Sequence, residues 1–167
     1  MKMISRISIL AILLSLFALP VAAQKNAGKE ADKHFEAAEY YLAAGYYKKA
    51  YEKEKKADKK ARFLFQMAEC YRHINDLKSA ETFYAKAIKA KYPDPICHLY
   101  IANIKKEFKR YEDAIIEYQN YQKEVPSSTE AELGIKSCEL AQKWVDNPTR
   151  HVVENMALIN SKENDYS

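Results

Sequence analysis

Residues 68–87 read AECYRHINDLKSAETFYAKA, and residues 102–121 read ANIKKEFKRYEDAIIEYQNY. When the second stretch is placed under the first, small and aromatic residues recur 34 positions apart: Ala68 with Ala102, Ala80 with Ala114, Tyr84 with Tyr118. A repeat of this length is typical of a unit made of two helices and a short turn. The body of the chain is therefore predicted to be a stack of helical hairpins.

An earlier copy of the unit fits with a shorter step. Ala38 precedes Ala68, and Ala50 precedes Ala80, by 30 positions. This alignment places Ala38 in the middle of a first helix and Ala50 early in a second helix. It also leaves three departures from the pattern: Glu54 in place of an aromatic in the first unit, Lys105 in place of a tyrosine in the third, and Tyr121 in place of a small residue there.

The order of small and aromatic residues resembles the tetratricopeptide repeat (TPR), in which small residues let two helices approach and aromatics fill the space between hairpins. The resemblance implies an all-α helical-hairpin solenoid over residues 30–147, with three repeats and a C-terminal capping helix. Three units are about the minimum that buries a continuous core. Ser127-Ser128-Thr129-Glu130 predicts the start of the capping helix, and Asn147-Pro148 its end.

Residues 1–23 have the pattern of a secretory signal peptide. Lys2 and Arg6 precede an apolar run, and small residues end at Ala23, where cleavage is expected. The alternative, a membrane-spanning helix, needs about 20 apolar residues, and this run is shorter. The mature chain is therefore expected to begin at Gln24, to be exported to the periplasm, and to have a linker over residues 24–29 before the solenoid.

The C-terminal segment, residues 148–167, differs in character from the helical body and predicts an extended tail. Its closing Asn-Asp-Tyr-Ser resembles the run-in to the first blade of a β-propeller. A signal peptide, TPR units and a propeller in this order resemble the front of OmpA-family envelope proteins associated with type IX secretion. Those proteins carry a peptidoglycan-binding module at their far end, which this sequence does not contain.

Composition and motifs give no sign of an enzyme. The net charge of +4 falls to +2 without the signal peptide, so nothing indicates nucleic-acid binding. Phosphate loops, nucleophile elbows and zinc helices are absent from the sequence, and no cofactor or small-molecule substrate is expected. The three cysteines, Cys70, Cys97 and Cys138, stand at helical core spacing and are expected to be buried, although one pair could form a disulfide. No second pair of ligands completes a metal site with Cys70 and His73.

In the TPR family the first helix of each unit lines a groove that binds partner proteins. Carried onto this sequence, the resemblance places in the groove Asp32, Phe35, Glu39 and Leu42 in the first unit, Arg62, Phe65, Glu69 and Arg72 in the second, and Ile96, Leu99, Asn103 and Lys106 in the third. Phe35, Phe65 and Leu99 stand where some family members have a lysine that grips a terminal carboxylate, so that clamp is not expected. The apolar residues suit an extended or helical protein segment, or alternatively contact the terminal helix or a further domain.

Two functions remain open from the sequence. The leading hypothesis is a non-catalytic, exported scaffold that binds protein partners in a cell-envelope complex. A more specific version of this hypothesis is that the complex serves secretion. The alternative is a structural spacer or oligomerisation module of a longer, OmpA-like protein anchored to peptidoglycan. The sequence identifies neither the partner nor the oligomeric state.

Overall fold

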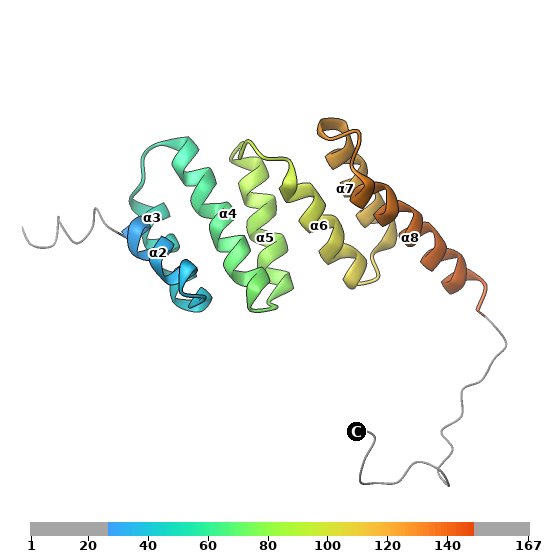
Figure 1. Ribbon diagram of the computed structural model, residues 1–167, viewed down its shortest axis with the longest axis horizontal. Coiled ribbons are helices and arrows are strands. Elements are labelled where there is room, and N and C mark those ends of the chain that lie inside the picture. The colour runs from blue at the N-terminus through green and yellow to red at the C-terminus, as the bar shows by residue number, and fades with distance from the viewer. Residues whose placement is uncertain (1–26, 149–167) are drawn as a thin grey trace, which may run out of the picture.

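The computed structural model describes residues 27–148, and within this range it contains only helices (Figure 1). Consecutive helices pack against each other as hairpins in a row, and α6 also contacts α8. The prediction of an all-α stack of three hairpins and a terminal helix is confirmed. The helices are α2 (Ala27–Glu36), α3 (Tyr40–Lys53), α4 (Ala57–His73), α5 (Leu77–Lys89), α6 (Ile96–Glu107), α7 (Tyr111–Glu124) and α8 (Thr129–Asp146).

The three hairpin turns share one backbone conformation. Ala38, Asn75 and Lys109 have positive φ angles of 58°, 60° and 59°. After each of them the chain donates backbone hydrogen bonds to carbonyls in the last turn of the preceding helix, as from Asp76 to Tyr71 at 2.9 Å. This left-handed ending satisfies carbonyl groups that a helix otherwise leaves without a donor. It also turns the chain sharply enough for the next helix to run back along the first.

The turns correct the predicted alignment of the first unit. Ala38 lies in the turn and not in the middle of a helix, so the shorter step is wrong. Structural equivalence pairs Ala43 with Ala80, which makes the first step longer than the second. Because Ala43 and Ala50 are two turns apart on one helix face, either of them fits the small-residue pattern. With the corrected step, Tyr47 supplies the aromatic that the first unit had seemed to lack.

The core consists of the small and aromatic residues that the repeat pattern singled out. Tyr84 and Tyr118 are fully buried, and Tyr47 is 1% exposed. Buried alanines lie in the helices that these tyrosines pack against, where their short side chains permit close helix packing. At the C-terminal end Ser128 caps α8, since its Oγ accepts a hydrogen bond from the Ala131 N–H at 3.2 Å. The predicted capping helix is thus confirmed, and it closes the core against α7.

The predicted segment boundaries need one correction. Helix α2 already begins at Ala27, whose side chain is buried, so residues 27–29 belong to the solenoid and not to a linker. The signal peptide and residues 149–167 of the tail lie outside the described residues and stay predictions. Among the described helices, none is both long and apolar enough to span a membrane.

All three cysteines are buried in this core, as predicted, and the structure has them as free thiols. Burial, joined by the neighbouring carboxylates of Glu69 and Asp94, raises the pKa of the Cys70 and Cys97 thiols to about 12. Because the thiolate is the reactive form, we expect the folded chain to resist thiol reagents at neutral pH. The check is the count of thiols that react with a disulfide dye. None should react quickly in buffer and all three should react in denaturant, whereas fast labelling of the folded chain would contradict the packing.

Both ends of the stack present charge where an inner unit has a core residue. Lys33 is exposed on α2, at the position that the buried Cys70 occupies in the second unit. Lys136 is exposed on α8, at the position that the buried Ala102 occupies in the third unit. Polar outer faces of this kind keep the ends of a repeat stack in water.

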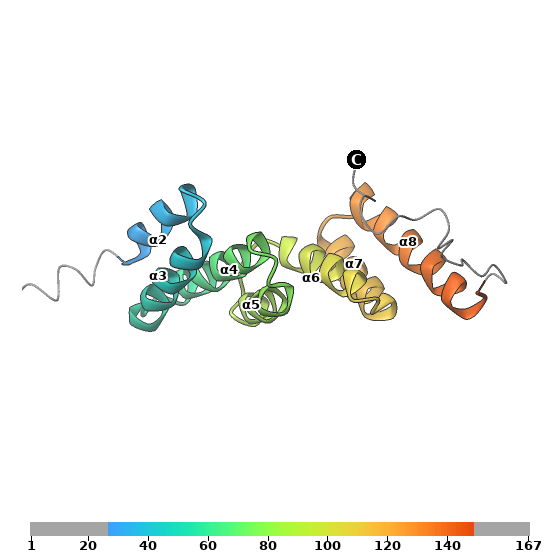
Figure 2. The same cartoon turned by 90° about the horizontal axis from the view of Figure 1, so that it is seen from below.

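The row of helices is arched. Figure 2 shows α2 and α8 raised on one side of the row, whereas α5 lies on the other side. The first helix of each hairpin therefore borders the hollow side of the arch. This hollow side is the groove. The second helices form the outer side.

Candidate functional site

A repeated hydrogen bond places one polar residue of each unit on the groove side. In every hairpin, the buried tyrosine of the second helix donates its hydroxyl to a residue of the first helix, always at the same separation along the chain. The pairs are Tyr47 with Asp32 at 2.8 Å, Tyr84 with Glu69, and Tyr118 with Asn103 at 2.5 Å. Because each acceptor is held from behind by a buried donor, the three side chains form a fixed row along the groove.

The central unit contains the most buried part of this row. Glu69 is 8% exposed and accepts from Tyr84 as well as from Arg72, whose Nη2 lies 2.7 Å from a Glu69 oxygen. Arg72 Nε also donates to the Tyr84 hydroxyl at 3.2 Å, and its guanidinium covers the ring of Tyr100. Burial and the hydrogen bond to Glu69 raise the pKa of Tyr84, so this phenol stays neutral and donates. The Arg72 side chain remains about one third exposed, facing the groove.

An ion pair joins the first two units across the groove. Arg62 of α4 donates to Asp32 of α2 at 2.7 Å, so one carboxylate oxygen holds both the arginine and Tyr47. Burial raises the pKa of Tyr47, and the hydrogen bond to Asp32 raises it further. About half of the Arg62 side chain is exposed. It can therefore contact a ligand in the groove while it stays paired.

The third unit is joined to α8 by weaker polar contacts. The Asn103 amide donates to Glu130 at 3.4 Å, and Lys106 Nζ donates to the Ser137 hydroxyl at 3.4 Å. Among the described residues, no carboxylate lies within ion-pair distance of Lys106. Positive charge at this end of the groove is therefore not fully compensated.

Ten of the twelve predicted groove residues lie on the first helix of their unit, which borders the groove, and two do not. Glu39 lies in the first turn beside His34, and Leu42 lies on α3, half exposed on the outer layer. Both errors follow from the wrong step in the first unit. With the corrected step, Asp32 and Phe35 are the equivalents of Glu69 and Arg72.

The apolar members of the predicted groove are packed and not free. Phe65 stacks on Tyr92, with ring centroids 4.5 Å apart, and Leu99 is only 2% exposed. Phe35 meets the rings of Tyr40 and His73 edge-on. These side chains support the groove from below, so replacing them would test folding and not docking.

Helix α8 contributes groove residues that sequence reasoning missed. Leu133, Ser137 and Leu140 stand one repeat length after Leu99, Asn103 and Lys106. Leu133 is 59% exposed and Leu140 45% exposed, because α8 has no second helix after it among residues 27–148. Extending the 34-residue alignment by one more unit, into α8, would have predicted these three residues in the groove.

The cysteine and histidine neighbours of the sequence do not converge on a metal site. Cys70 is buried, whereas His73 is exposed and stacks on Tyr40 with ring centroids 4.2 Å apart. The Nδ1 of His98 lies 2.7 Å from a carboxylate oxygen of Glu117. No group of three His, Cys, Asp or Glu side chains that could hold a metal occurs within residues 27–148.

A second charge cluster joins α6 to α7 behind the groove. Burial opposes the charge of Glu117, but hydrogen bonds from His98 and Lys105 outweigh it and lower the pKa of Glu117. A lowered folded pKa contributes stability that is present above the pKa of an unfolded glutamate, about 4.3, and is lost as the pH falls through the folded value. Glu117→Gln should therefore cost about 1–2 kcal/mol at pH 7.

The same substitution should cost progressively less as the pH falls below the unfolded value, because the unfolded wild type is protonated first, and the advantage of the carboxylate is gone once folded Glu117 is protonated as well. Urea unfolding of both chains at pH 7 and at about pH 3.5 measures this difference. A penalty that stays constant across the range would show that charge on Glu117 does not stabilise the hairpin.

Solved structures with the same arrangement of helices are TPR domains. The first TPR of Spaghetti (RPAP3), bound to the HSP90 peptide SRMEEVD, has a TM-score of 0.62 at 15% identity and covers 72% of this chain and 93% of its own. The Arabidopsis OM64 TPR domain has a TM-score of 0.60 at 15% identity, covering 72% and 97%. This chain has the tetratricopeptide-repeat fold.

The TPR fold is shared by the whole hairpin stack and not by one unit. The Sgt2 TPR domain from Aspergillus fumigatus matches with a TM-score of 0.60 at 14% identity, covering 81% of this chain and 91% of its own. No protein-family model matches the sequence, and no curated protein does either. At these identities the likeness establishes the TPR architecture alone.

Proposed function

We propose that this chain is an exported, non-catalytic TPR scaffold whose groove binds partner proteins in a cell-envelope complex. TPR domains generally mediate protein–protein interaction, and one of the similar structures holds a peptide. The observation that carries the proposal is the row of partly exposed side chains along the groove. Arg62 and Arg72 come from α4 and Lys106 comes from the next first helix, α6, and hydrogen-bonded partners hold all three in place.

The proposed location rests on sequence patterns. The basic start, apolar run and small residues before Gln24 favour export, and the resemblance of the tail to a propeller run-in favours an envelope complex linked to secretion. Mass spectrometry of the chain from its own cells tests the first point. A mature N-terminus at Gln24 in the envelope fraction supports export, whereas an intact Met1 in the cytoplasmic fraction contradicts it.

The alternative of an oligomerisation module receives less support from the fold. The two ends of the stack carry charged residues where a further hairpin would need core residues, with Lys33 at one end and Lys136 at the other. Lys33 pairs with Glu30 and Lys136 with Glu132, and end-to-end stacking of copies would take these exposed ion pairs out of water, which is costly. A spacer role stays open to experiment.

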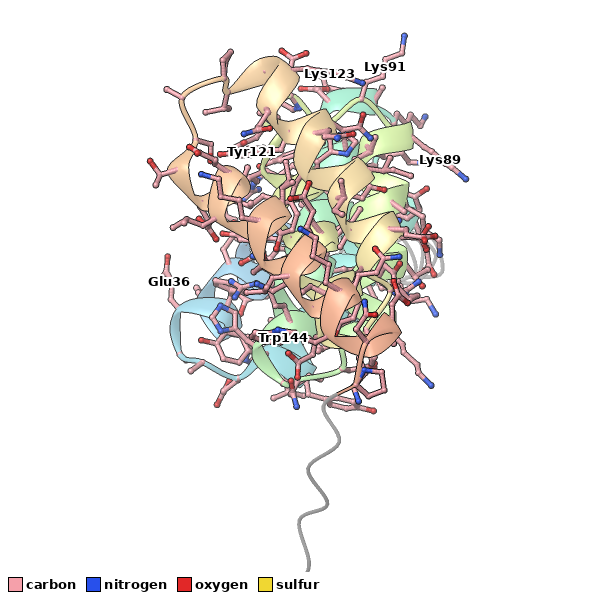
Figure 3. All side chains as sticks on the ribbon, turned by 90° about the vertical axis from the view of Figure 1, so that its right-hand side faces the viewer. Glu36, Lys89, Lys91, Tyr121, Lys123 and Trp144 are labelled. Carbon is pink, nitrogen blue, oxygen red and sulfur yellow. The ribbon has the colours of Figure 1, made fainter. Side chains whose placement is uncertain are left out.

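Cross-linked capture of the chain from the envelope fraction separates docking from a spacer role. We compare a groove variant, Arg62→Glu with Lys106→Glu, with an outer variant of the same charge change, Lys89→Glu with Lys123→Glu. Figure 3 shows Lys89 and Lys123 directed away from the body of the stack. We expect the groove variant to lose the proteins that the wild type and the outer variant capture, with helicity unchanged by circular dichroism. Equal capture by all three chains would contradict groove docking.

A further inference from the structure

An apolar stripe on α8 is left uncovered by the described part of the chain. Leu133, Ser137, Leu140 and Trp144 follow one another at alternating steps of four and three, which places them on one face of a helix. Leu133 is 59%, Leu140 45% and Trp144 66% exposed. Figure 3 looks at the C-terminal end of the stack and labels Trp144 on α8. A cluster of three large exposed apolar side chains on one helix indicates a contact surface.

The stripe has no role in closing the core. Helix α8 packs on the stack through another face, where Ala131, Gly134 and Cys138 are buried and Gly134 lies against the ring of Tyr118. On the far flank of the stripe runs a row of residues of alternating charge: Glu132, Lys136, Glu139 and Lys143. Lys136 pairs with Glu132 in this row at 2.5 Å. The stripe therefore lies between the buried face of α8 and a solvent-exposed row of residues whose positive and negative charges balance each other.

The groove flank of the stripe has Glu130 at its N-terminal end, where Glu130 accepts a hydrogen bond from Asn103, and is positive beside the C-terminal half that begins at Ser137. Lys106 reaches Ser137, the polar residue within the stripe, and Lys109 lines the same hollow between α6 and α8. Neither lysine has a carboxylate within ion-pair distance among residues 27–148. Glu107 is the only acid lining this hollow, so two positive charges face one negative charge.

We propose that this stripe binds an acidic amphipathic helix of a partner protein. The apolar face of that helix packs on Leu133, Leu140 and Trp144, and its carboxylates face Lys106 and Lys109. The spacing of the stripe matches the way in which two helices pack along a seam, and the positive flank selects a negative partner. This inference rests on the proposed docking function and names the class of segment that one end of the groove takes.

Trp144 is the only tryptophan of the chain, so its fluorescence reports directly on the stripe. The probe is a synthetic helical peptide of about 15 residues with leucines along one face and glutamates beside them, titrated into the full chain. A matched peptide carries lysines in place of the glutamates. We expect the glutamate peptide to shift the Trp144 emission to shorter wavelength with saturation, and to bind at least about tenfold more tightly than the lysine peptide at low salt.

Variants assign the effect to the stripe and its flank. Lys106→Glu with Lys109→Glu should reverse the preference between the two peptides, and Leu140→Glu should abolish binding of both. The outer variant, Lys89→Glu with Lys123→Glu, should bind as the wild type does. Circular dichroism confirms that each variant is helical, so that lost binding is not lost folding.

Three results would overturn the inference. Equal binding of the two peptides, or no binding of either, removes the acidic helix as occupant. A Trp144 shift that grows with protein concentration alone identifies a second copy on the stripe. A shorter emission wavelength in the full chain that is lost when residues 149–167 are deleted identifies the chain's own C-terminal segment. Groove-dependent capture of envelope proteins alongside any of these results would leave the docking function intact.

Discussion

Gly134→Ala is expected to lower the free energy of unfolding by about 2 kcal/mol, although alanine is the better helix former. A Cβ atom at this position would lie 2.6 Å from Cε1 of the Tyr118 ring, 2.7 Å from Cε2, and closer still to Cζ. Tyr118 is fully buried and its hydroxyl is held by Asn103, so the ring cannot move aside. Overpacking of a tight core site outweighs the helix propensity gained. Urea unfolding measures the change.

The chain contains a matched control for this substitution. Gly45 also lies within a helix, α3, but a Cβ atom added there meets nothing within 4 Å. Gly45→Ala should therefore raise the free energy of unfolding by about 0.5–1 kcal/mol. If Gly134→Ala stabilises the chain as Gly45→Ala does, α8 does not pack on Tyr118 as described.

Glu69→Ala is expected to cost about 2–3 kcal/mol, because the substitution leaves two groups without their partner. Tyr84 would keep a fully buried hydroxyl without its acceptor, and Arg72 would lose its ion pair. The partial exposure of Arg72 keeps the cost below that of a fully buried pair. Thermal and urea unfolding of the variant measure the loss.

Two further variants separate the parts of this network. Glu69→Gln retains an oxygen for the Tyr84 hydroxyl and should cost only about 1 kcal/mol. Glu69→Leu combined with Arg72→Met removes both charges and should recover part of the loss of Glu69→Ala. If all three chains unfold at the same urea concentration as the wild type, the network does not stabilise the central hairpin.

The architecture could be predicted from the sequence because its repeat is carried by packing. The alanines and tyrosines that recur from the second unit to the third are the side chains that the helices bury, so their spacing reports the hairpin directly. The start of α8 could be predicted equally well, since Ser128 marks it by a local hydrogen bond. Local and packing signals agree in the second and third units.

The first unit was predicted in the wrong register for an equally physical reason. Helix α4 has 17 residues against 12 in α6, so the step from the first unit to the second is longer than the step that follows it. Small residues two turns apart in α3 then allowed a false alignment, which assigned Glu39 and Leu42 to the groove. The turn residue Ala38 gives no help, because its positive φ is visible only in the structure.

The composition of the groove was harder to predict than its location. The sequence indicated an apolar row through Phe35, Phe65 and Leu99, but neighbouring side chains cover these residues. What faces the groove is a polar row with arginine and lysine, and apolar side chains are exposed there on α8. Exposure depends on which helix follows, and the pattern of a single helix does not contain that information.

The groove, and not the outer side of the stack, is the proposed binding surface for partner proteins. The most direct measurement is photo-cross-linking in the native cell, with a photoreactive amino acid placed at Arg62 or Ser137 in the groove, or at Lys89 or Ile116 on the second helices. Cross-links to a defined protein from the groove positions alone are the predicted result. Cross-links from the outer positions alone, or from none, would contradict binding in the groove.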